Sequence, residues 1–386
     1  MKAYLILEDG TVFTGTSIGS PREVISEIVF NTSMTGYLEV LTDPSYAGQS
    51  VVMTYPLIGN YGVCREDMES FKPWVKGYIV RELSRIPSNF RSDESIQHFL
   101  EVFDIPGICH IDTRSLTKLL REKGTMNGMI TTKEYADISE PVSRIKAYQV
   151  EGVVMETSTK EVQVLPGVSL IGGIVSSGGK VLSAGNGNVL SEMYPGAGKR
   201  VALLDLGAKM NIARSLNRRG CEVTIYPAST KAEEILAGKP DGIMLSNGPG
   251  DPAENVEIIR EIRKLYESDV PIFAICLGHQ LMALAAGAST YKLKYGHRGG
   301  NHPVKDLETG RVYISSQNHG YAVDTSSIDP EVAVPAFVNV NDGTNEGLRY
   351  VEKNIFTVQY HPEACPGPLD SGYLFDRFLR MMEVEK

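Results

Sequence analysis

The chain has 386 residues, of which 42% are hydrophobic, so its length favours two or three domains with buried cores. Its formal net charge of -9 argues against a nucleic-acid partner, because phosphate binding needs a basic surface. The five cysteines form no CxxC pair, and the sequence has neither a signal peptide nor a membrane-spanning apolar run, so we expect a cytoplasmic protein without disulfides.

The first part of the sequence predicts a mixed β/α domain over residues 1–157. Alternating apolar residues on both sides of an early Asp-Gly pair predict a hairpin, and residues 112–121 have an aspartate cap followed by helical spacing. Residues 31–37 and 41–49 are rich in glycine and hydroxyl side chains, which is typical of loops that present side chains outward. An ordinary surface loop is the simpler interpretation of these two segments.

The middle segment, residues 158–199, is rich in glycine and serine and predicts a linker. It ends in Gly-Ala-Gly-Lys, but these four residues do not predict a phosphate loop. Arg200 stands where that motif needs serine or threonine, and the glycines precede a strand whereas the motif's glycines follow one.

Residues 200–386 alternate strand and helix patterns in a regular way. Strands are expected over 201–204, 223–226, 242–245 and 270–275, and helices over 210–218, 231–237 and 256–266. This alternation predicts an α/β domain with a doubly wound, mostly parallel sheet, whose ligands bind at the carboxyl ends of the strands. The rest of the chain predicts short strands and hairpins, a strand over 355–360 and a closing amphipathic helix over 374–382.

Cys276 directly follows the strand predicted over residues 270–275, and an apolar helix comes after it. Gly278 lets the backbone turn sharply, so we expect the thiol at the carboxyl end of the strand with a helix N-terminus directed at it. This is the geometry of a nucleophile elbow with sulfur in place of a serine oxygen. An unpaired cysteine in a core is the commoner alternative, and the spacing alone leaves both interpretations open.

A base and an orienting carboxylate are found late in the chain. His361 directly follows the strand predicted over residues 355–360, and Glu363 can lie on the same side because side chains two positions apart in an extended chain face the same way. A cysteine with a later histidine and a carboxylate forms a set of nucleophile, base and orienter. A lone histidine would more often be structural, so the inference depends on Glu363.

Residues 246–252 read Ser-Asn-Gly-Pro-Gly-Asp-Pro and follow the strand predicted over 242–245. Two glycines held by two prolines make a stiff turn that can direct backbone N–H groups at one point. Such donors suit the oxyanion of a tetrahedral intermediate. A plain tight turn is the alternative.

The string Cys276-Leu277-Gly278-His279-Gln280, together with His361-Pro362-Glu363, resembles the class I (triad) glutamine amidotransferases. The whole chain is similar to the family of small, glutamine-hydrolysing chains of carbamoyl phosphate synthetases, and the similarity is weakest in the glycine- and serine-rich segment. The resemblance implies a flavodoxin-like C-terminal domain over residues 200–386. It also implies hydrolysis of L-glutamine through a cysteinyl thioester by a triad of Cys276, His361 and Glu363.

The resemblance further implies which residues surround the substrate. The family's oxyanion and glutamine contacts correspond to Gly248 and Gly250, with Leu277 giving the second oxyanion N–H. The remaining glutamine contacts that it implies are Ser45 from the N-terminal domain, Gln280, and three residues of a loop over 317–321, namely Asn318, Gly320 and Tyr321.

The partner that the resemblance implies is the large synthetase subunit, which uses ATP, Mg²⁺ and bicarbonate with the released ammonia to make carbamoyl phosphate. This product feeds pyrimidine and arginine biosynthesis, and the two chains form a heterodimer. No cofactor is expected in this chain, and no metal, because His297, His302 and His319 lack a carboxylate or cysteine at ligand spacing. Two alternatives are a γ-glutamyl peptidase and a non-catalytic regulatory scaffold.

Overall fold

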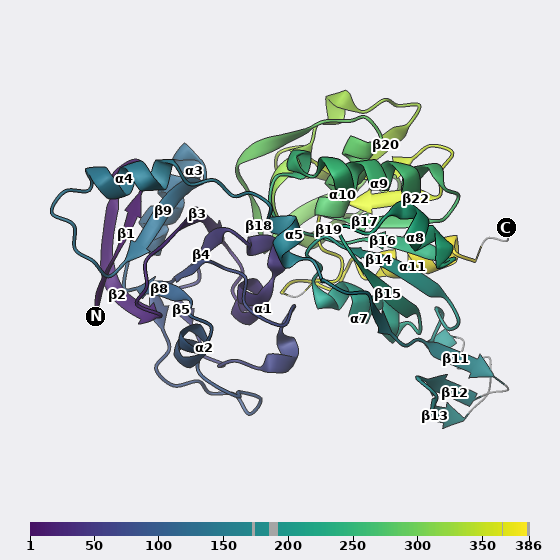
Figure 1. Cartoon of the computed structure of the whole chain (residues 1–386), viewed down its shortest axis with the longest axis horizontal. Helices are drawn as coiled ribbons and strands as arrows, with labels where there is room; N and C mark the ends of the chain where they lie inside the picture. Colours follow the sequence, from purple (N-terminus) through teal and green to yellow (C-terminus); the bar gives the residue numbers. More distant parts are fainter. Residues whose placement is uncertain (172–173, 185–191, 365, 384–386) are drawn as a thin grey trace. The chain divides into compact units, whose positions relative to one another are not determined.

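The computed structural model describes residues 1–171, 174–184, 192–364 and 366–383 (Figure 1). The chain divides into two compact units. The first unit consists of Met1–Val153 and Lys292–Asn301, and the second consists of Val154–Tyr291 and His302–Lys386. The segment Lys292–Asn301 thus belongs to the first unit, although it lies in the sequence between the strands and helices of the second.

The first unit is built on a closed β-barrel. In spatial order its strands are β1 (Lys2–Leu7), β2 (Val12–Gly19), β8 (Pro106–Cys109), β6 (Gly77–Ile79), β4 (Gln49–Met53), β3 (Val24–Asn31) and β9 (Met126–Thr131), and β9 pairs with β1 to close it. Apolar side chains such as Leu5, Ile28 and Ile108 are fully buried together and form one core cluster of this unit. The predicted hairpin is confirmed by the antiparallel pairing of β1 with β2.

Helices and short elements complete the first unit. They are α1 (Tyr37–Thr42), α2 (Ile96–Val102), α3 (Thr113–Lys123), α4 (Ser139–Lys146), the 3-10 turns η1 (Pro44–Tyr46) and η2 (Arg65–Asp67), and a two-stranded sheet of β5 (Leu57–Ile58) and β7 (Glu82–Leu83). The helix predicted over 112–121 is confirmed as α3, where the Asp112 side chain accepts a hydrogen bond from the Ser115 N–H at 3.0 Å.

The prediction that residues 41–49 form a loop is wrong in part. Residues Tyr37–Thr42 form α1, and Ser45 lies in the short turn η1. The Asp43 carboxylate accepts a hydrogen bond from the Ser45 N–H at 2.9 Å and caps this turn. The high density of glycine and hydroxyl groups therefore reflects capped short elements, because the same side chains that favour loops also cap helices.

The second unit contains a ten-stranded sheet. In spatial order its strands are β10 (Gln163–Leu165), β15 (Glu222–Pro227), β14 (Arg200–Asp205), β16 (Gly242–Leu245), β17 (Ile272–Ile275), β22 (Ile355–Val358), β21 (Asn345–Tyr350), β20 (Ala333–Asn339), β18 (Thr290–Asp306) and β19 (Val312–Val323). The five strands from β15 to β22 are parallel and follow the order 2-1-3-4-5 along the chain. This is the flavodoxin-like order, so the predicted doubly wound sheet is confirmed.

Helices cover both faces of the parallel strands, as shown by which side chains pack together. Successive residues of β14 alternate between two core clusters: Ala202 and Leu204 join the first, and Val201 and Leu203 join the second. The first cluster includes buried residues of α8 (Ala232–Ala237), α9 (Val256–Glu267) and α10 (Leu277–Ala285). The second includes those of α7 (Met210–Arg218) and α11 (Tyr373–Met381). The sheet is therefore a layer between two layers of helices (Figure 1).

The segment predicted as a linker contains regular structure where it is described. Strand β10 pairs with β15 at one edge of the large sheet, and β11 (Val168–Ile171), β12 (Ile174–Ser177) and β13 (Lys180–Ala184) form a separate three-stranded sheet. Residues 172–173 and 185–191 of this segment lie outside the described residues. The remaining short elements of the unit are α5 (Val153–Thr157), η3 (Pro252–Glu254) and η4 (Thr325–Ser327). None of the described helices has the length and apolar character that a membrane span requires.

Replacement of Phe273 tests the core of the second unit. This side chain is fully buried, and its ring stacks on Phe356 at 4.3 Å and meets the edges of two further phenylalanines of α11. Phe273→Ala is expected to lower the free energy of unfolding by roughly 3–5 kcal/mol, because it leaves a cavity in a packed cluster. Urea unfolding followed by far-UV circular dichroism measures this. Phe90→Ala, at a side chain 99% exposed, is the control and should change stability by less than about 0.5 kcal/mol.

Candidate active site

Four segments meet at one edge of the parallel sheet, because each follows the carboxyl end of a neighbouring strand. Lys209 comes shortly after β14, residues 246–252 follow β16, Cys276 follows β17, and His361 follows β22. In doubly wound sheets this edge is where ligands bind. The topology therefore gathers the predicted nucleophile, the predicted base and the predicted oxyanion loop at the same end of the sheet.

Cys276 occupies a sharp turn between β17 and α10. Its φ of 53° and ψ of -106° are unusual for a residue with a side chain, and such strain persists only where the surroundings enforce it. Its N–H donates a hydrogen bond to Val358 O at 2.8 Å, three positions before His361. The thiol donates to Asn318 O at 3.7 Å. The predicted elbow is therefore present, with the sulfur beside the strand that carries the predicted substrate residues.

Gly278 is the residue that lets α10 start so close to β16. Its N–H donates to Ser246 O at 3.0 Å, and a Cβ at this position would lie 2.6 Å from Leu245 O. Any larger residue would push the helix away from the strand. The four described cysteines are all free and buried, and Cys365 lies outside the described residues.

His361 is held by the carboxylate of Glu363. The His361 Nδ1 and Glu363 Oε1 atoms are 2.7 Å apart, and both side chains are buried. The tautomer that donates from Nδ1 leaves Nε2 as a proton acceptor. Within the described part of the chain this buried Nε2 has no hydrogen-bond partner. The histidine is therefore oriented as a base whose accepting nitrogen is still available.

The charge of Glu363 is stabilised by Lys209, which sequence reasoning missed. Lys209 Nζ lies 2.8 Å from Glu363 Oε1, with 3% of the lysine side chain and none of the glutamate side chain exposed. Burial by itself would raise the pKa of Glu363. The charges of Lys209 and His361 and their hydrogen bonds outweigh it, so the pKa falls from the usual 4.5 to about 2. Glu363 is thus an anion at neutral pH and able to stabilise an imidazolium.

The position of Lys209 in the fold, and not a local sequence pattern, marks it as a site residue. The lysine follows the first parallel strand at the point where the strand order reverses, which is the usual ligand crevice of this fold. Its backbone N–H donates to Asn247 Oδ1 at 2.9 Å, and Asn247 Nδ2 donates to Gly207 O at 3.0 Å. The Asn247 side chain therefore ties the segment after β14 to the segment after β16.

Gly248 and Leu277 carry the two backbone N–H groups predicted to bind an oxyanion. A Cβ on Gly248 would lie 2.1 Å from Leu206 O and 2.7 Å from Leu277 Cδ2, so the loop packs closely against the start of α10. In the part of the chain that the structure describes, neither N–H donates a hydrogen bond. Gly250 has a φ of 86° in the same loop. The arrangement offers two donors, next to the nucleophile, for a developing negative charge.

The prediction that residues 317–321 form a loop is wrong. Asn318, Gly320 and Tyr321 lie within strand β19 (Val312–Val323). Gln280 reaches this strand from α10, since its Nε2 donates to Tyr321 O at 2.8 Å and to Gln359 Oε1 at 2.9 Å. Gln280 therefore positions the strand through its amide nitrogen, and Gln359 is a second residue that the sequence pattern did not single out.

Ser45 is the one predicted site residue that belongs to the first unit. The other predicted residues all belong to the second unit. The role of Ser45 in binding glutamine stays a prediction.

Lys209→Met tests the buried ion pair. The substitution keeps most of the apolar stem but leaves the Glu363 charge buried beside His361 alone, so stability should fall by roughly 3–5 kcal/mol in urea unfolding at neutral pH. Lys264→Met is the matched control, because Lys264 pairs with Glu233 at 3.0 Å on the exposed surface of α9. It should cost less than about 1 kcal/mol. Equal losses in the two variants would contradict the role given to Lys209.

Comparison with known proteins gives the family. Residues 5–130 match the family model "Carbamoyl-phosphate synthase small chain, CPSase domain", and residues 202–381 match "Glutamine amidotransferase class-I". The chain is 49% identical to the carbamoyl phosphate synthase small chain of Listeria innocua over 386 residues, which cover 100% of this chain and 98% of that protein. It is 47% identical to the protein of the same name from Symbiobacterium thermophilum, with 98% of each covered. The chain therefore belongs to the carbamoyl phosphate synthase small-chain family.

Proposed function

We propose that this chain hydrolyses L-glutamine to glutamate and ammonia through a cysteinyl thioester. The observation that carries the proposal is the strained Cys276 elbow on the strand next to the one that leads to the buried His361–Glu363 pair. The Nε2 atom of His361 takes the thiol proton, and the thiolate attacks the side-chain amide carbon of glutamine. A C–S bond forms as the carbonyl becomes a tetrahedral oxyanion.

The second half of the reaction releases both products. The N–H groups of Gly248 and Leu277 stabilise the oxyanion, and each such donor is worth roughly 10²–10³ in rate. As the C–N bond breaks, His361 returns its proton to the departing ammonia. The same nitrogen then deprotonates a water molecule, which attacks the thioester and regenerates the thiol together with glutamate. Glu363 keeps the imidazole oriented and balances its positive charge in both halves.

The glutamine pocket is proposed to consist of eight residues. Its members are Ser45, Gly248, Gly250, Leu277, Gln280, Asn318, Gly320 and Tyr321. For Gln280, Asn318 and Tyr321, the support is the pair of contacts from Gln280 to Tyr321 and from Cys276 to Asn318. For Ser45 the support is the family resemblance alone.

The ammonia is proposed to pass to a large synthetase subunit in a heterodimer located in the cytoplasm. That partner would use ATP, Mg²⁺ and bicarbonate to make carbamoyl phosphate for pyrimidine and arginine biosynthesis. The match of residues 5–130 to a domain specific to these small chains supports this partner. A γ-glutamyl peptidase would not need that domain, and a purely regulatory scaffold would not need an intact Cys276, His361 and Glu363.

Cys276→Ser is the direct test of the nucleophile. Glutaminase turnover should fall by at least about 10³-fold, because the hydroxyl is a much weaker nucleophile than the thiol at neutral pH, while glutamine binding is retained. Ammonia release and isothermal titration with glutamine measure the two quantities. Cys64→Ala, in the first unit, is the control and should keep full turnover. Substantial turnover by Cys276→Ser would overturn the assignment.

The partner is tested by measuring release of ammonia and glutamate by the purified chain, alone and with a large synthetase chain, ATP and bicarbonate. We expect slow release alone and a steep rise with the partner, together with carbamoyl phosphate. Faster turnover of γ-glutamyl peptides than of glutamine would instead favour a peptidase. Carbamoyl phosphate formed from glutamine at the normal rate by a complex that contains Cys276→Ala would favour the scaffold.

A further inference from the structure

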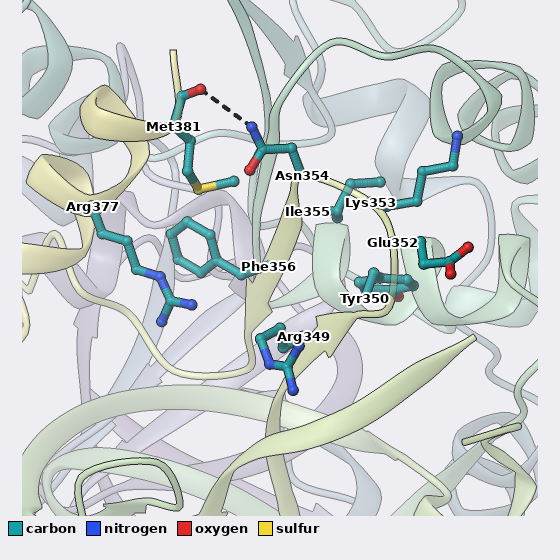
Figure 2. Close-up of a pocket in the computed structure, with 9 residues that line it drawn as sticks. All are labelled: Arg349, Tyr350, Glu352, Lys353, Asn354, Ile355, Phe356, Arg377 and Met381. Carbon is teal, nitrogen blue, oxygen red and sulfur yellow. Dashed lines mark hydrogen bonds between the residues drawn. The ribbon is translucent and has the colours of Figure 1, made fainter. Parts of the chain in front are cut away.

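The second unit has a pocket at the opposite end of β22 from His361. Residues 352–354 of the turn between β21 and β22 line it together with Ile355, the first residue of β22, and with Arg377 and Met381 of α11 (Figure 2). Its volume is about 350 Å³, within the range of small-molecule sites. Because His361 lies beyond the carboxyl end of the same strand, the pocket is separate from the triad.

Two arginines stand out among the groups that line this pocket. Figure 2 shows the guanidinium groups of Arg349 and Arg377 on the same side of the Phe356 ring. Within the described part of the chain, neither side chain forms an ion pair or a hydrogen bond. The ammonium group of Lys353 also lines the pocket but points away from the two arginines (Figure 2). Two guanidinium groups that line the same pocket repel each other, and a bound anion would offset that repulsion.

Three acidic side chains lie around the two pockets that the arginines line. The Glu352 carboxylate lies on the Lys353 side of the pocket (Figure 2). Arg349 and Arg377 also line an adjoining pocket of about 420 Å³, which includes Asp306 and Glu308. Asp306 Oδ1 accepts hydrogen bonds from the Glu308 and Thr309 N–H groups at 2.9 and 3.2 Å. Among the described residues, neither the Asp306 nor the Glu308 carboxylate forms an ion pair with Arg349 or Arg377. The two guanidinium groups thus line both pockets, and no described carboxylate lies within ion-pair distance of them.

The walls of the pocket hold one of these arginines in place. The Arg377 guanidinium lies 4.7 Å from the centre of the buried Phe356 ring, which orients it by a cation–π contact. Asn354 Nδ2 donates to Met381 O at 3.2 Å, so the turn before β22 is tied to the end of α11 (Figure 2). The buried rings of Tyr350 and Phe356 add an apolar wall. A pocket with a fixed cation, a second cation beside it and an apolar wall is prepared to bind an organic oxyanion.

We propose that this pocket binds a small organic molecule through phosphate or carboxylate groups that Arg349 and Arg377 recognise. The planar guanidinium group offers paired N–H donors that match two oxygens of either group, and such bonds are among the strongest in proteins. The site goes beyond glutamine hydrolysis, because none of its residues belongs to the proposed glutamine pocket. It gives the glutaminase domain a second ligand site.

Isothermal titration of the full chain with pyrophosphate and, separately, with citrate at low ionic strength tests the site. We expect saturable binding by the unmodified chain, and at least about tenfold weaker binding by Arg349→Gln and by Arg377→Gln. Arg380→Gln is the matched control, because it removes the same charge from α11 as Arg377→Gln does. Arg380 is exposed and lines neither pocket. The affinity of this variant should stay within about twofold.

The two probes distinguish the sources of the oxyanion. Binding of pyrophosphate alone assigns the pocket to phosphorylated molecules, and binding of citrate alone assigns it to carboxylates. The Arg349 side chain is exposed and has no hydrogen-bond or ion-pair partner among the described residues, so Arg349→Gln keeps the test valid even if Arg377→Gln loses stability with its Phe356 contact. Absence of saturable binding of both probes, or equal affinities in all three variants, would overturn the proposal. Glutamine takes no part in the measurement, so its outcome is independent of the proposed hydrolysis.

Discussion

The buried ion pair between Lys209 and Glu363 is the interaction on which the site depends. An isolated carboxylate at this depth would favour its neutral form, which could not stabilise an imidazolium. Lys209 at 2.8 Å offsets the loss of hydration and keeps the group ionised. The pair also joins the segment after β14 to the segment after β22, which are separated along the chain by most of the unit. This one contact therefore keeps Glu363 ionised and also holds together the two segments that follow β14 and β22.

The strain at Cys276 is maintained by the strands on either side of it. A backbone conformation of this kind costs about 1–3 kcal/mol, so it needs compensating contacts. The parallel pairing of β17 with β22 continues into the bond from the Cys276 N–H to Val358 O, and Gly278 allows α10 to donate to Ser246 O. The turn is thus fixed from both neighbouring strands. The same two bonds place the nucleophile between the strand that leads to the base and the loop that offers the Gly248 N–H.

Local pattern predicts the second unit well and the first unit poorly, for a physical reason. The helix expected over 210–218 and the strand expected over 242–245 agree with α7 and β16, because amphipathic spacing and buried apolar runs are properties of a single segment. The barrel of the first unit joins β2 to β8 and β4 to β6, and such pairings between distant strands leave no periodic mark. The same limit applies to residues 317–321, which the family resemblance implied to be a loop and which tertiary pairing makes part of β19. It also explains Lys209, whose partner lies 154 positions later in the printed sequence.

The two ends of β22 use different sources of electrostatic potential. At the carboxyl edge the start of α10 supplies unpaired N–H groups and the positive end of its helix dipole, so backbone alone favours an anion there. At the amino edge the neighbouring helix terminus is the carboxyl end of α11, whose dipole disfavours anions and favours a cation such as Arg380 in its last turn. The dipole accounts neither for Arg377, which lies in the middle of α11, nor for Arg349, which comes from β21. An anion at the amino edge must therefore be bound by charged side chains, because the backbone potential there is unfavourable. This explains why two guanidinium groups are needed at the amino edge, whereas two backbone N–H groups serve at the carboxyl edge.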